Sequence, residues 1–257
     1  MSTQRRDRIL AEMGIKPVWR LRELPAEVER EVSAEMHAEA SVNEAPEPAQ
    51  SHFESASEGR DAAAQYPADH LAANLDWDGL QQAVADCRAC RLCERRKQAV
   101  LGVGDRQADW LFVGEGPGAD EDERGEPFVG QAGKLLDAML ASISMERGKN
   151  VYIANAVKCR PPGNRTPEVD EMATCRPFLE RQIGLIQPKL IVALGRPAAQ
   201  TLLGGEPKIS ASRGRLFRFA GIPVIVTYHP AYLLRNLTDK AKAWEDLCFA
   251  QDEMAKL

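Results

Sequence analysis

Residues 151–166 read V-Y-I-A-N-A-V-K-C-R-P-P-G-N-R-T, and this stretch indicates both a fold and a site. Its first part is apolar and rich in β-branched residues, which predicts a buried strand. Two prolines and a glycine then end the strand and begin an irregular loop. Asn155 and Cys159 lie where strand becomes loop. Because open α/β sheets bind ligands at the carboxyl ends of their strands, we expect an amide in a cleft with a soft metal ligand behind it.

The remaining elements predict an α/β fold. Three further apolar runs have the length and composition of buried strands, at residues 109–114, 189–195 and 221–228. Helical periodicity is found at residues 75–84, 133–143, 168–186, 197–203 and 239–257. Strands that alternate with helices predict a parallel sheet covered by helices on both faces. We expect this folded domain to span residues 74–257.

The charge of the chain is unevenly distributed. The net charge of −5 arises in residues 23–70, which carry twelve acidic and two basic residues. Residues 71–257 carry 24 acidic and 25 basic residues. An acidic total therefore does not exclude a nucleic-acid partner for the folded part. Residues 23–73, which are poor in aromatic residues, are predicted to be a disordered linker. Residues 1–22 form a basic amphipathic segment, either a fraying terminus or a docking motif for a protein partner, with Trp19 as its anchor.

The sequence contains no membrane or export signal that we can identify. No apolar run approaches the roughly 18 residues of a membrane helix, and the N-terminus lacks a signal-peptide core. We therefore expect a cytoplasmic protein with no membrane partner.

Six cysteines in a cytoplasmic protein require an explanation other than disulfides. Five of them form two groups: Cys87, Cys90 and Cys93 in a C-x2-C-x2-C run, then Cys159 and Cys175. Four thiolates suit either a zinc ion or an iron–sulfur cluster, and the residues alone leave both open. Because Glu94 follows the run where a ferredoxin has a further Cys-Pro, we interpret the site as structural, with Cys93 spare. Cys248 stands alone and is expected to be unligated.

The strand at 109–114 continues into a glycine-rich loop, G-E-G-P-G-A-D-E-D-E-R-G-E-P-F-V-G, at residues 114–130. Closely spaced glycines let backbone N–H groups approach a ligand. The loop has no Walker lysine and is strongly acidic, which argues against a bound triphosphate. It favours a neutral ligand whose edges are read by backbone amides. Phe128 is either a core residue or a ring that stacks on a planar ligand.

A histidine follows the last predicted strand, in T-Y-H-P-A-Y-L-L-R-N at residues 227–236. The proline after His229 holds the chain extended. A lone histidine is often structural, but this one is expected at the same sheet edge as Glu115 and Asn155. That placement favours a catalytic role.

The next residues of this loop, Leu233, Leu234 and Arg235, put bulky apolar groups in a polar segment. One interpretation is a loop packed on the core. The other is a wedge that enters a stack of bases, with the arginine on a phosphate.

Together these segments resemble the family 4 uracil-DNA glycosylases, the iron–sulfur branch of the uracil-DNA glycosylase superfamily. The matching segments occur in the family's order: D-C-R-A-C-R-L (86–92), G-E-G-P-G-A-D-E-D (114–122), G-E-P-F-V-G (125–130), N-A-V-K-C-R-P-P-G-N-R-T-P (155–167), Cys175, and H-P-A-Y-L-L-R (229–235). They cover nearly all of residues 74–257, and residues 1–73 lie outside the resemblance.

The resemblance implies an α/β/α sandwich around a four-stranded parallel sheet. It implies an enzyme that removes uracil from single- or double-stranded DNA by hydrolysing its bond to deoxyribose, leaving an abasic site for base excision repair. It also implies a [4Fe–4S] cluster held by Cys87, Cys90, Cys159 and Cys175. We expect a monomer, associated with the nucleoid if the source is prokaryotic.

The resemblance also implies individual roles in the pocket. Asn155 would read the polar edge of uracil, and Phe128 would stack on its ring. Glu115 and Gly116 would line the pocket through their backbone. His229 would donate a hydrogen bond to uracil O2 as negative charge develops there.

The sequence leaves the position of the attacking water open. Gly116 stands where many superfamily members have an aspartate for this purpose, so the water is held by Glu121, by backbone groups, or by the field of the pocket. Two other functions remain possible from the sequence alone. One is an inert nucleic-acid-binding module with a structural iron–sulfur or four-cysteine zinc site, and the other is a zinc protein that acts on a nucleotide.

Overall fold

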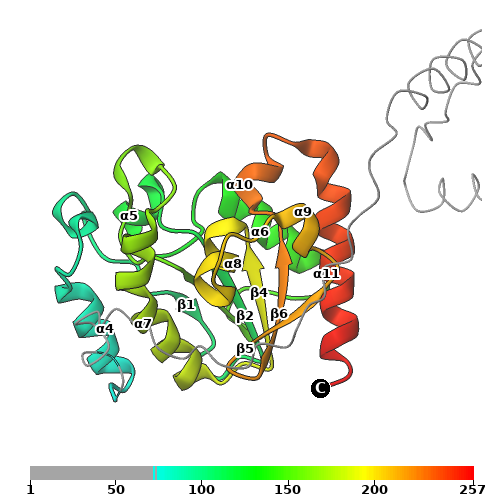
Figure 1. The fold of residues 1–257 in the computed structure, drawn as a ribbon, viewed down its shortest axis with the longest axis horizontal. Coiled ribbons are helices and arrows are strands. Elements are labelled where there is room, and N and C mark those ends of the chain that lie inside the picture. The colour runs from blue at the N-terminus through cyan, green and yellow to red at the C-terminus, as the bar shows by residue number, and fades with distance from the viewer. Residues whose placement is uncertain (1–71, 73) are drawn as a thin grey trace, which may run out of the picture. The chain divides into compact units, whose positions relative to one another are not determined.

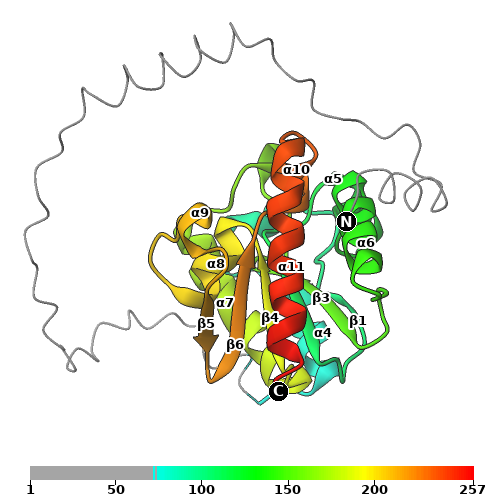
Figure 2. The ribbon, with the colours of Figure 1, turned by 90° about the vertical axis from the view of Figure 1, so that its right-hand side faces the viewer.

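The computed structural model describes residue 72 and residues 74–257. The predicted docking segment at 1–22 lies outside the described residues, as does the predicted linker at 23–73 except for Ala72. The described part is a three-layer α/β/α arrangement (Figures 1 and 2). Helices α6 (Gln131–Ser142) and α11 (Lys240–Met254) cover one face of the sheet, and α7 (Val169–Ile186) and α8 (Arg196–Leu203) cover the other.

The sheet has six strands in the order β1-β3-β2-β4-β6-β5. Their bounds are β1 Val103–Gly104, β2 Trp110–Gly114, β3 Val151–Asn155, β4 Leu190–Leu194, β5 Leu216–Phe219 and β6 Ile222–Thr227. Neighbouring strands within β3-β2-β4-β6 are parallel, and β1 and β5 pair antiparallel at the two edges.

The expectation of a four-stranded sheet was therefore wrong in the number of strands. The sequence did not predict β1 and β5. Strand β1 is only two residues long, too short for any periodicity to be visible. Strand β5 is partly exposed and lacks the continuous apolar run by which the buried strands were found.

The central strands are apolar on both faces because both faces are covered by helices. In β2, Trp110 and Phe112 pack in the hydrophobic cluster beneath α6 and α11, while Leu111 and Val113 pack in the cluster beneath α7 and α8. This alternation explains why a continuous run such as W-L-F-V-G forms a strand. The cluster beneath α6 and α11 extends past the strand ends to Phe128 and Leu233.

A third hydrophobic cluster lies at the flank of the sheet and joins the first described helix to the cysteine segment. Helix α4 (Trp77–Asp86) is capped by Asp76, whose carboxylate accepts a hydrogen bond from the Gly79 N–H at 2.9 Å. Its buried Leu80 and Val84 lie in the same cluster as Phe178 of α7. Cys87, Cys90, Cys159 and Cys175 contribute to this cluster.

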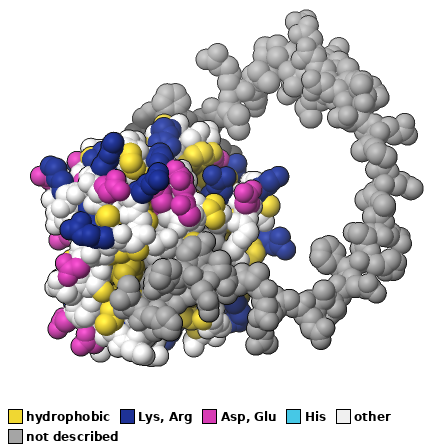
Figure 3. Space-filling view, turned by 60° about the vertical axis from the view of Figure 1, so that its left-hand side comes forward, with side chains coloured by type: hydrophobic (Ala, Val, Ile, Leu, Met, Phe, Trp, Pro, Cys, Tyr) yellow, Lys and Arg dark blue, Asp and Glu magenta, His cyan; other side chains and the backbone are white. Residues whose placement is uncertain are grey.

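The shorter elements are α5 Ala119–Arg124, α9 Ile209–Ser212 and α10 Pro230–Leu233, with 3-10 turns at Arg91–Glu94, Pro162–Asn164 and Leu237–Asp239. In Figure 1, α5 and α10 lie at the end of the molecule toward which β2, β4 and β6 run. Lys and Arg side chains gather at this end, mixed with Asp and Glu, on the face shown in Figure 3. Among the described residues, no helix has the length and apolar character needed to span a bilayer.

Candidate functional site

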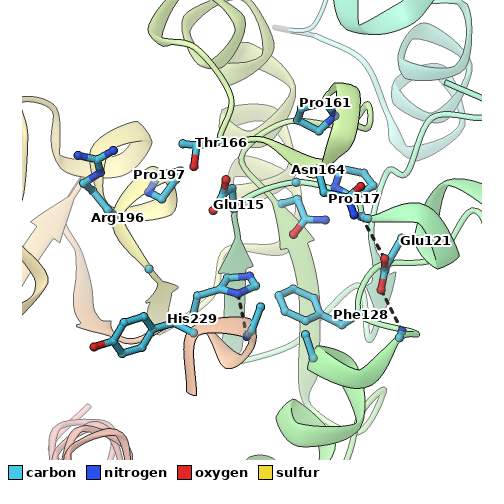
Figure 4. A pocket seen from close by; sticks show the side chains of 18 of the residues that line it. Glu115, Pro117, Glu121, Phe128, Pro161, Asn164, Thr166, Arg196, Pro197 and His229 are labelled. Carbon is cyan, nitrogen blue, oxygen red and sulfur yellow. Dashed lines mark hydrogen bonds between the residues drawn. The ribbon is translucent and has the colours of Figure 1, made fainter. Parts of the chain in front are cut away.

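A cleft of about 880 Å³ opens at the carboxyl ends of the central strands. Its lining includes the predicted pocket residues and one predicted wedge residue: Glu115, Gly116, Glu121, Phe128, Asn155, His229 and Arg235. Asn155 ends β3, and the others lie in the segments that follow β2 and β6. Figure 4 shows Glu115, Phe128 and His229 around one opening. The structure thus brings together residues that are more than 100 positions apart in the chain.

Asn155 is the last residue of β3 and lies at the base of this cleft. The strand register pairs it with Gly114, the last residue of β2. The Asn155 side chain is almost fully buried at 2% exposure, and its Oδ1 has no hydrogen-bond partner among the described residues. A buried unpaired acceptor is costly, so its persistence beside a cleft points to a donor supplied by a ligand.

Gly114 makes this arrangement possible because it has no side chain. A Cβ placed on Gly114 would lie 2.5 Å from Asn155 Oδ1 and 2.5 Å from Phe128 Cζ. Both distances are far inside normal van der Waals contact. The glycine therefore leaves the space that the amide and the aromatic ring occupy.

Phe128 is held in an unusual backbone conformation, with φ of +56°. Arg147 stabilises this turn: its guanidinium donates to the backbone carbonyls of Pro127 and Phe128, each at 2.8 Å, and to Asp137. The Phe128 ring stacks near the His229 ring, with centroids 5.5 Å apart. Left-handed backbone costs a residue other than glycine roughly 1–3 kcal/mol, so the contacts of Arg147 are what hold Phe128 in this conformation.

His229 is fixed as a neutral imidazole with a defined tautomer. Its Nδ1 accepts a hydrogen bond from the Ala231 N–H at the start of α10, at 3.1 Å, which leaves the proton on Nε2. Burial, reinforced by the positive charge of Arg235, lowers the pKa of His229 to about 4. At neutral pH this residue is therefore a hydrogen-bond donor without a charge.

Glu121 connects α5 to the loop that carries Phe128. Its Oε1 accepts from the N–H groups of Val129 and Gly130, at 2.9 and 3.0 Å, and its Oε2 accepts from the Gly118 N–H at 3.0 Å. Figure 4 shows this carboxylate between the two segments. Because Oε2 accepts a single bond, it keeps a lone pair, and the predicted water-positioning role stays a prediction.

Glu115 and Gly116 follow β2 directly. Burial raises the pKa of the Glu115 carboxyl, an effect that Thr166 and Arg196 oppose. A Cβ on Gly116 would lie 2.7 Å from Val157 Cγ2, so an aspartate would require this segment to move. The space around position 116 therefore fits a glycine and is too small for a side chain.

The structure separates the three predicted wedge residues. Leu233 is 1% exposed and packs in the core beneath α6 and α11, whereas Leu234 is 41% exposed. Arg235 is exposed and lines the cleft. The burial of Leu233 argues against its insertion into DNA, and Leu234 and Arg235 are the two residues that face outward.

Five cysteines line a second, much smaller cavity behind Asn155: Cys87, Cys90, Cys93, Cys159 and Cys175. Both groups predicted from the sequence thus face one space, while Cys248 lies on α11 and does not line this cavity. Among the described residues, no three ligating side chains are arranged to hold a single metal ion. The structure shows a cysteine-lined cavity and no coordination geometry.

Two cysteine sulfurs in this cavity accept hydrogen bonds. Arg96 Nη1 donates to Cys159 Sγ at 2.8 Å, and the Lys158 N–H donates to Cys175 Sγ at 3.3 Å. Without a metal, burial raises the pKa of Cys159 to about 11 and that of Cys175 to about 12. A metal reverses this preference, since a coordinating thiol loses its proton. N–H donors aimed at sulfur are the environment that thiolate ligands require.

Comparison with known proteins identifies the family of this chain. The sequence profile of the uracil DNA glycosylase superfamily matches residues 101–248. This chain belongs to the uracil-DNA glycosylase superfamily. Among its relatives, a type-4 uracil-DNA glycosylase of Pyrobaculum aerophilum is 41% identical over 181 residues, which are 67% of this chain and 92% of the relative. That of Thermotoga maritima is 44% identical over 166 residues, 63% of this chain and 85% of the relative.

Membership of the superfamily confirms the resemblance, but sequence reasoning missed several supporting residues of the site. Arg147, Arg96 and Lys158 are the clearest cases, since each acts through backbone carbonyls or sulfur atoms brought near by the fold. Lys158 stands within the quoted segment 155–167 but was given no role there, and no local pattern marks the two arginines. Gly114 was quoted as part of a motif, but its spatial role depends on the register of β2 against β3.

The close approach at Gly114 generates a test. Gly114→Ala should lower kcat for uracil excision by roughly 100-fold, because the added methyl group displaces the amide and the ring from a fixed geometry. The measurement is the rate of uracil excision by the purified variant after its folding has been verified. Gly184→Ala on α7 is the matched control, since nothing lies within 4 Å of its added Cβ. Equal activity in the two variants would show that the Gly114 space is not required.

Proposed function

We propose that this chain is a DNA repair glycosylase that flips uracil out of DNA and hydrolyses its bond to deoxyribose. The observation that carries the proposal is the buried, unpaired Asn155 Oδ1 at the base of a cleft, in a chain of the uracil-DNA glycosylase superfamily. Relatives named type-4 uracil-DNA glycosylases are 41–44% identical to it and support the substrate.

Asn155 supplies the hydrogen-bonding pattern that uracil needs. Uracil presents an N3–H donor and an O4 acceptor on adjacent positions, and an amide presents one acceptor and two donors. Asn155 Oδ1 accepts from N3–H while Nδ2 donates to O4. Cytosine presents the opposite pattern at both positions, so it leaves buried groups of the site unpaired and is rejected.

Phe128 and His229 complete the pocket for a planar base. The Phe128 ring stacks on uracil, and His229 donates from Nε2 to uracil O2. When the bond between C1′ and N1 breaks, its electron pair moves to the base and spreads onto O2. A fixed, uncharged donor at that oxygen stabilises the transition state, in which negative charge develops on the base.

Water completes the reaction at the sugar. It attacks C1′ of the oxocarbenium-like deoxyribose, the new C1′–OH bond forms, and the proton released from water balances the uracil anion. We assign Glu121 as the group that orients this water through the free lone pair of Oε2. Glu115 and Gly116 line the pocket beside it.

Leu234 and Arg235 form the outward-facing wedge that supports base flipping. A base inside a duplex is unreachable, and extruding it costs a few kcal/mol. An exposed leucine that fills the vacated space recovers part of that cost, while Arg235 and the exposed Arg196 at the cleft offer positive charge to phosphates. The Lys and Arg side chains at this end of the molecule support a DNA surface here (Figure 3).

The cysteine-lined cavity is proposed to hold a [4Fe–4S] cluster through Cys87, Cys90, Cys159 and Cys175. The donor set fits, since four thiolates are what such a cluster takes and two of these sulfurs already accept N–H donors. The chemistry that the cluster supplies is structural cross-linking of α4, the loop after β3 and α7. Every catalytic step is performed by groups in the other cleft.

The central prediction concerns uracil itself. The full chain should release uracil from an oligonucleotide, seen as strand scission after alkali, and Asn155→Ala should lower kcat by roughly 10²–10³-fold. The control is Asn74→Ala, since Asn74 is exposed and does not line the cleft. Absence of scission by the wild-type chain on both single- and double-stranded substrates would refute the proposed function.

The lowered pKa of His229 predicts an unusual pH profile. The neutral imidazole is the active form, so excision is present above the folded-state pKa and is lost as the pH falls through about 4. A histidine with an ordinary pKa near 6.5 would lose activity about 2.5 pH units earlier as the pH falls. The measurement is kcat against pH, with circular dichroism to verify folding. An acid limb near 6.5 that disappears in His229→Ala would contradict the assignment.

The cluster proposal predicts roughly four iron atoms per chain and a broad visible absorbance in protein purified without oxygen. Cys87→Ser should lose most of the iron. Cys93→Ser and Cys248→Ser should retain it, which separates the four proposed ligands from the two remaining cysteines. Stoichiometric zinc in a colourless wild-type protein would rule the cluster out.

The wedge proposal predicts a difference between substrates. Leu234→Ala should slow excision from double-stranded DNA roughly tenfold and leave single-stranded DNA almost unaffected, because only a duplex requires the vacated space to be filled. Leu237→Ala provides the control, since Leu237 is also an exposed leucine, at 64%, in the next turn and lies outside the proposed wedge. Equal losses on the two substrates would exclude a wedge.

A further inference from the structure

Lys158 is a buried cation between the two cavities. Its side chain is 1% exposed. Its Nζ donates to the backbone carbonyl of Asn155 at 2.9 Å and to Oε1 of Gln182. Its backbone N–H donates to Cys175 Sγ at 3.3 Å, and its carbonyl accepts from the Val100 N–H at 2.8 Å. One residue therefore contacts the main chain of the base-reading residue and a sulfur of the cysteine site.

Gln182 of α7 holds the lysine in this place. It is fully buried, and its Nε2 donates to the Leu101 carbonyl at 3.0 Å and to the Tyr152 hydroxyl at 3.3 Å. Those two bonds orient the amide so that Oε1 faces Lys158. The Lys158 ammonium group is therefore held by Gln182, which is itself held by Leu101 and Tyr152.

The charge of Lys158 has no carboxylate partner within residues 72 and 74–257. The groups beside it that lose a proton on metal ligation are Cys175, whose Sγ accepts from the Lys158 N–H at 3.3 Å, and Cys159, the next residue in the chain. A buried charge is expensive unless it is paired and hydrogen-bonded. Thiolates that ligate a metal centre supply the missing negative charge.

We propose that Lys158 is a positioning residue that fixes the main chain at Asn155, and that the thiolates of the cysteine site are its counter-charge. The proposal rests on the proposed function, since it gives Lys158 a role in reading uracil. Under this proposal the cysteine site influences the cleft that binds uracil, in addition to cross-linking the fold. The negative charge of the ligating thiolates keeps the Lys158 ammonium group in place. The ammonium group in turn holds the backbone carbonyl of Asn155, whose side-chain amide reads uracil.

The test is a double-mutant cycle with Lys158→Met and Asn155→Ala in the full chain carrying its iron. Methionine keeps the length of the side chain and removes the donor and the charge. Lys158→Met should lower kcat for uracil excision at least tenfold with little change in KM. In the Asn155→Ala background the same substitution should cost less than about twofold, because residues that act through one another are not additive. Lys189→Met, at an exposed lysine of the same fold, should change neither constant.

A binding measurement gives a readout independent of turnover. Fluorescence anisotropy compares duplex DNA containing a hydrolysis-resistant 2′-fluoro-2′-deoxyuridine with the same duplex without uracil. Lys158→Met should lose at least tenfold of the preference for the uracil duplex and keep the affinity for undamaged DNA, with iron content unchanged. A residue that only stabilises the fold would lower both affinities together.

The outcomes separate this inference from the proposed function. Additive losses in the cycle, or an unchanged uracil preference in Lys158→Met, would overturn the role of Lys158 while the wild-type enzyme remains active. An inactive wild-type chain that shows no preference for the uracil duplex would overturn the proposed function itself. If Lys158→Met does not fold with its iron, Gln182→Leu removes the acceptor that orients Lys158, and its loss of kcat should likewise vanish in the Asn155→Ala background.

Discussion

The pairing of Asn155 with Gly114 across two parallel strands is the constraint on which the site depends. It places an amide at the end of one buried strand opposite a residue with no side chain at the end of its neighbour. The space created there is shared by the Asn155 side chain and the Phe128 ring. The left-handed turn at Phe128, with Arg147 bonded to its carbonyl, brings that ring back over the strand ends.

The segment from Asn155 to Cys159 serves two cavities because it lies between them. Asn155 faces the larger cleft, Cys159 faces the smaller cysteine-lined cavity, and Lys158 joins the two through hydrogen bonds. Backbone bonds to the neighbouring strand also hold this segment, from the Ala156 N–H to the Gly114 carbonyl at 2.9 Å and from the Val157 N–H to the Glu115 carbonyl at 3.1 Å. Under our proposals, metal ligation restrains one side of the segment and the strand register restrains the other, so the reading amide is placed before the base arrives.

Much of this could be read from the sequence, for identifiable reasons. The four central strands were predicted because each is buried on both faces and appears as a continuous apolar run. Glu115, Asn155 and His229 were predicted because they stand at or just after the ends of those strands, and the roles of the pocket residues were implied by the resemblance. Superfamily membership confirms the resemblance itself. The edge strands β1 and β5 were missed because their residues are few or partly exposed. The burial of Leu233 was missed too, since two adjacent leucines look alike until the direction of α10 is known.

The residues that support the site were beyond sequence reasoning for a different reason. Arg147 and Gln182 donate to the backbone carbonyls of Pro127 and Leu101, which lie 20 and 81 positions away. Lys158 meets the Gln182 side chain across 24 positions. Every residue has a backbone carbonyl, so the amino-acid type at the accepting position does not reveal that a hydrogen bond is made there. The charge of Lys158 also looks ordinary in a sequence, where its complete burial cannot be seen.

The most direct test of the central claim is inhibition of excision by free bases. The unpaired Asn155 Oδ1 accepts the N3–H of uracil, so uracil should inhibit the wild-type chain and 3-methyluracil, which lacks that proton, should inhibit at least tenfold more weakly. In Asn155→Ala the difference between the two bases should disappear. Equal inhibition of the wild-type chain by uracil and 3-methyluracil would contradict the account, because the buried acceptor would then not be reading the base.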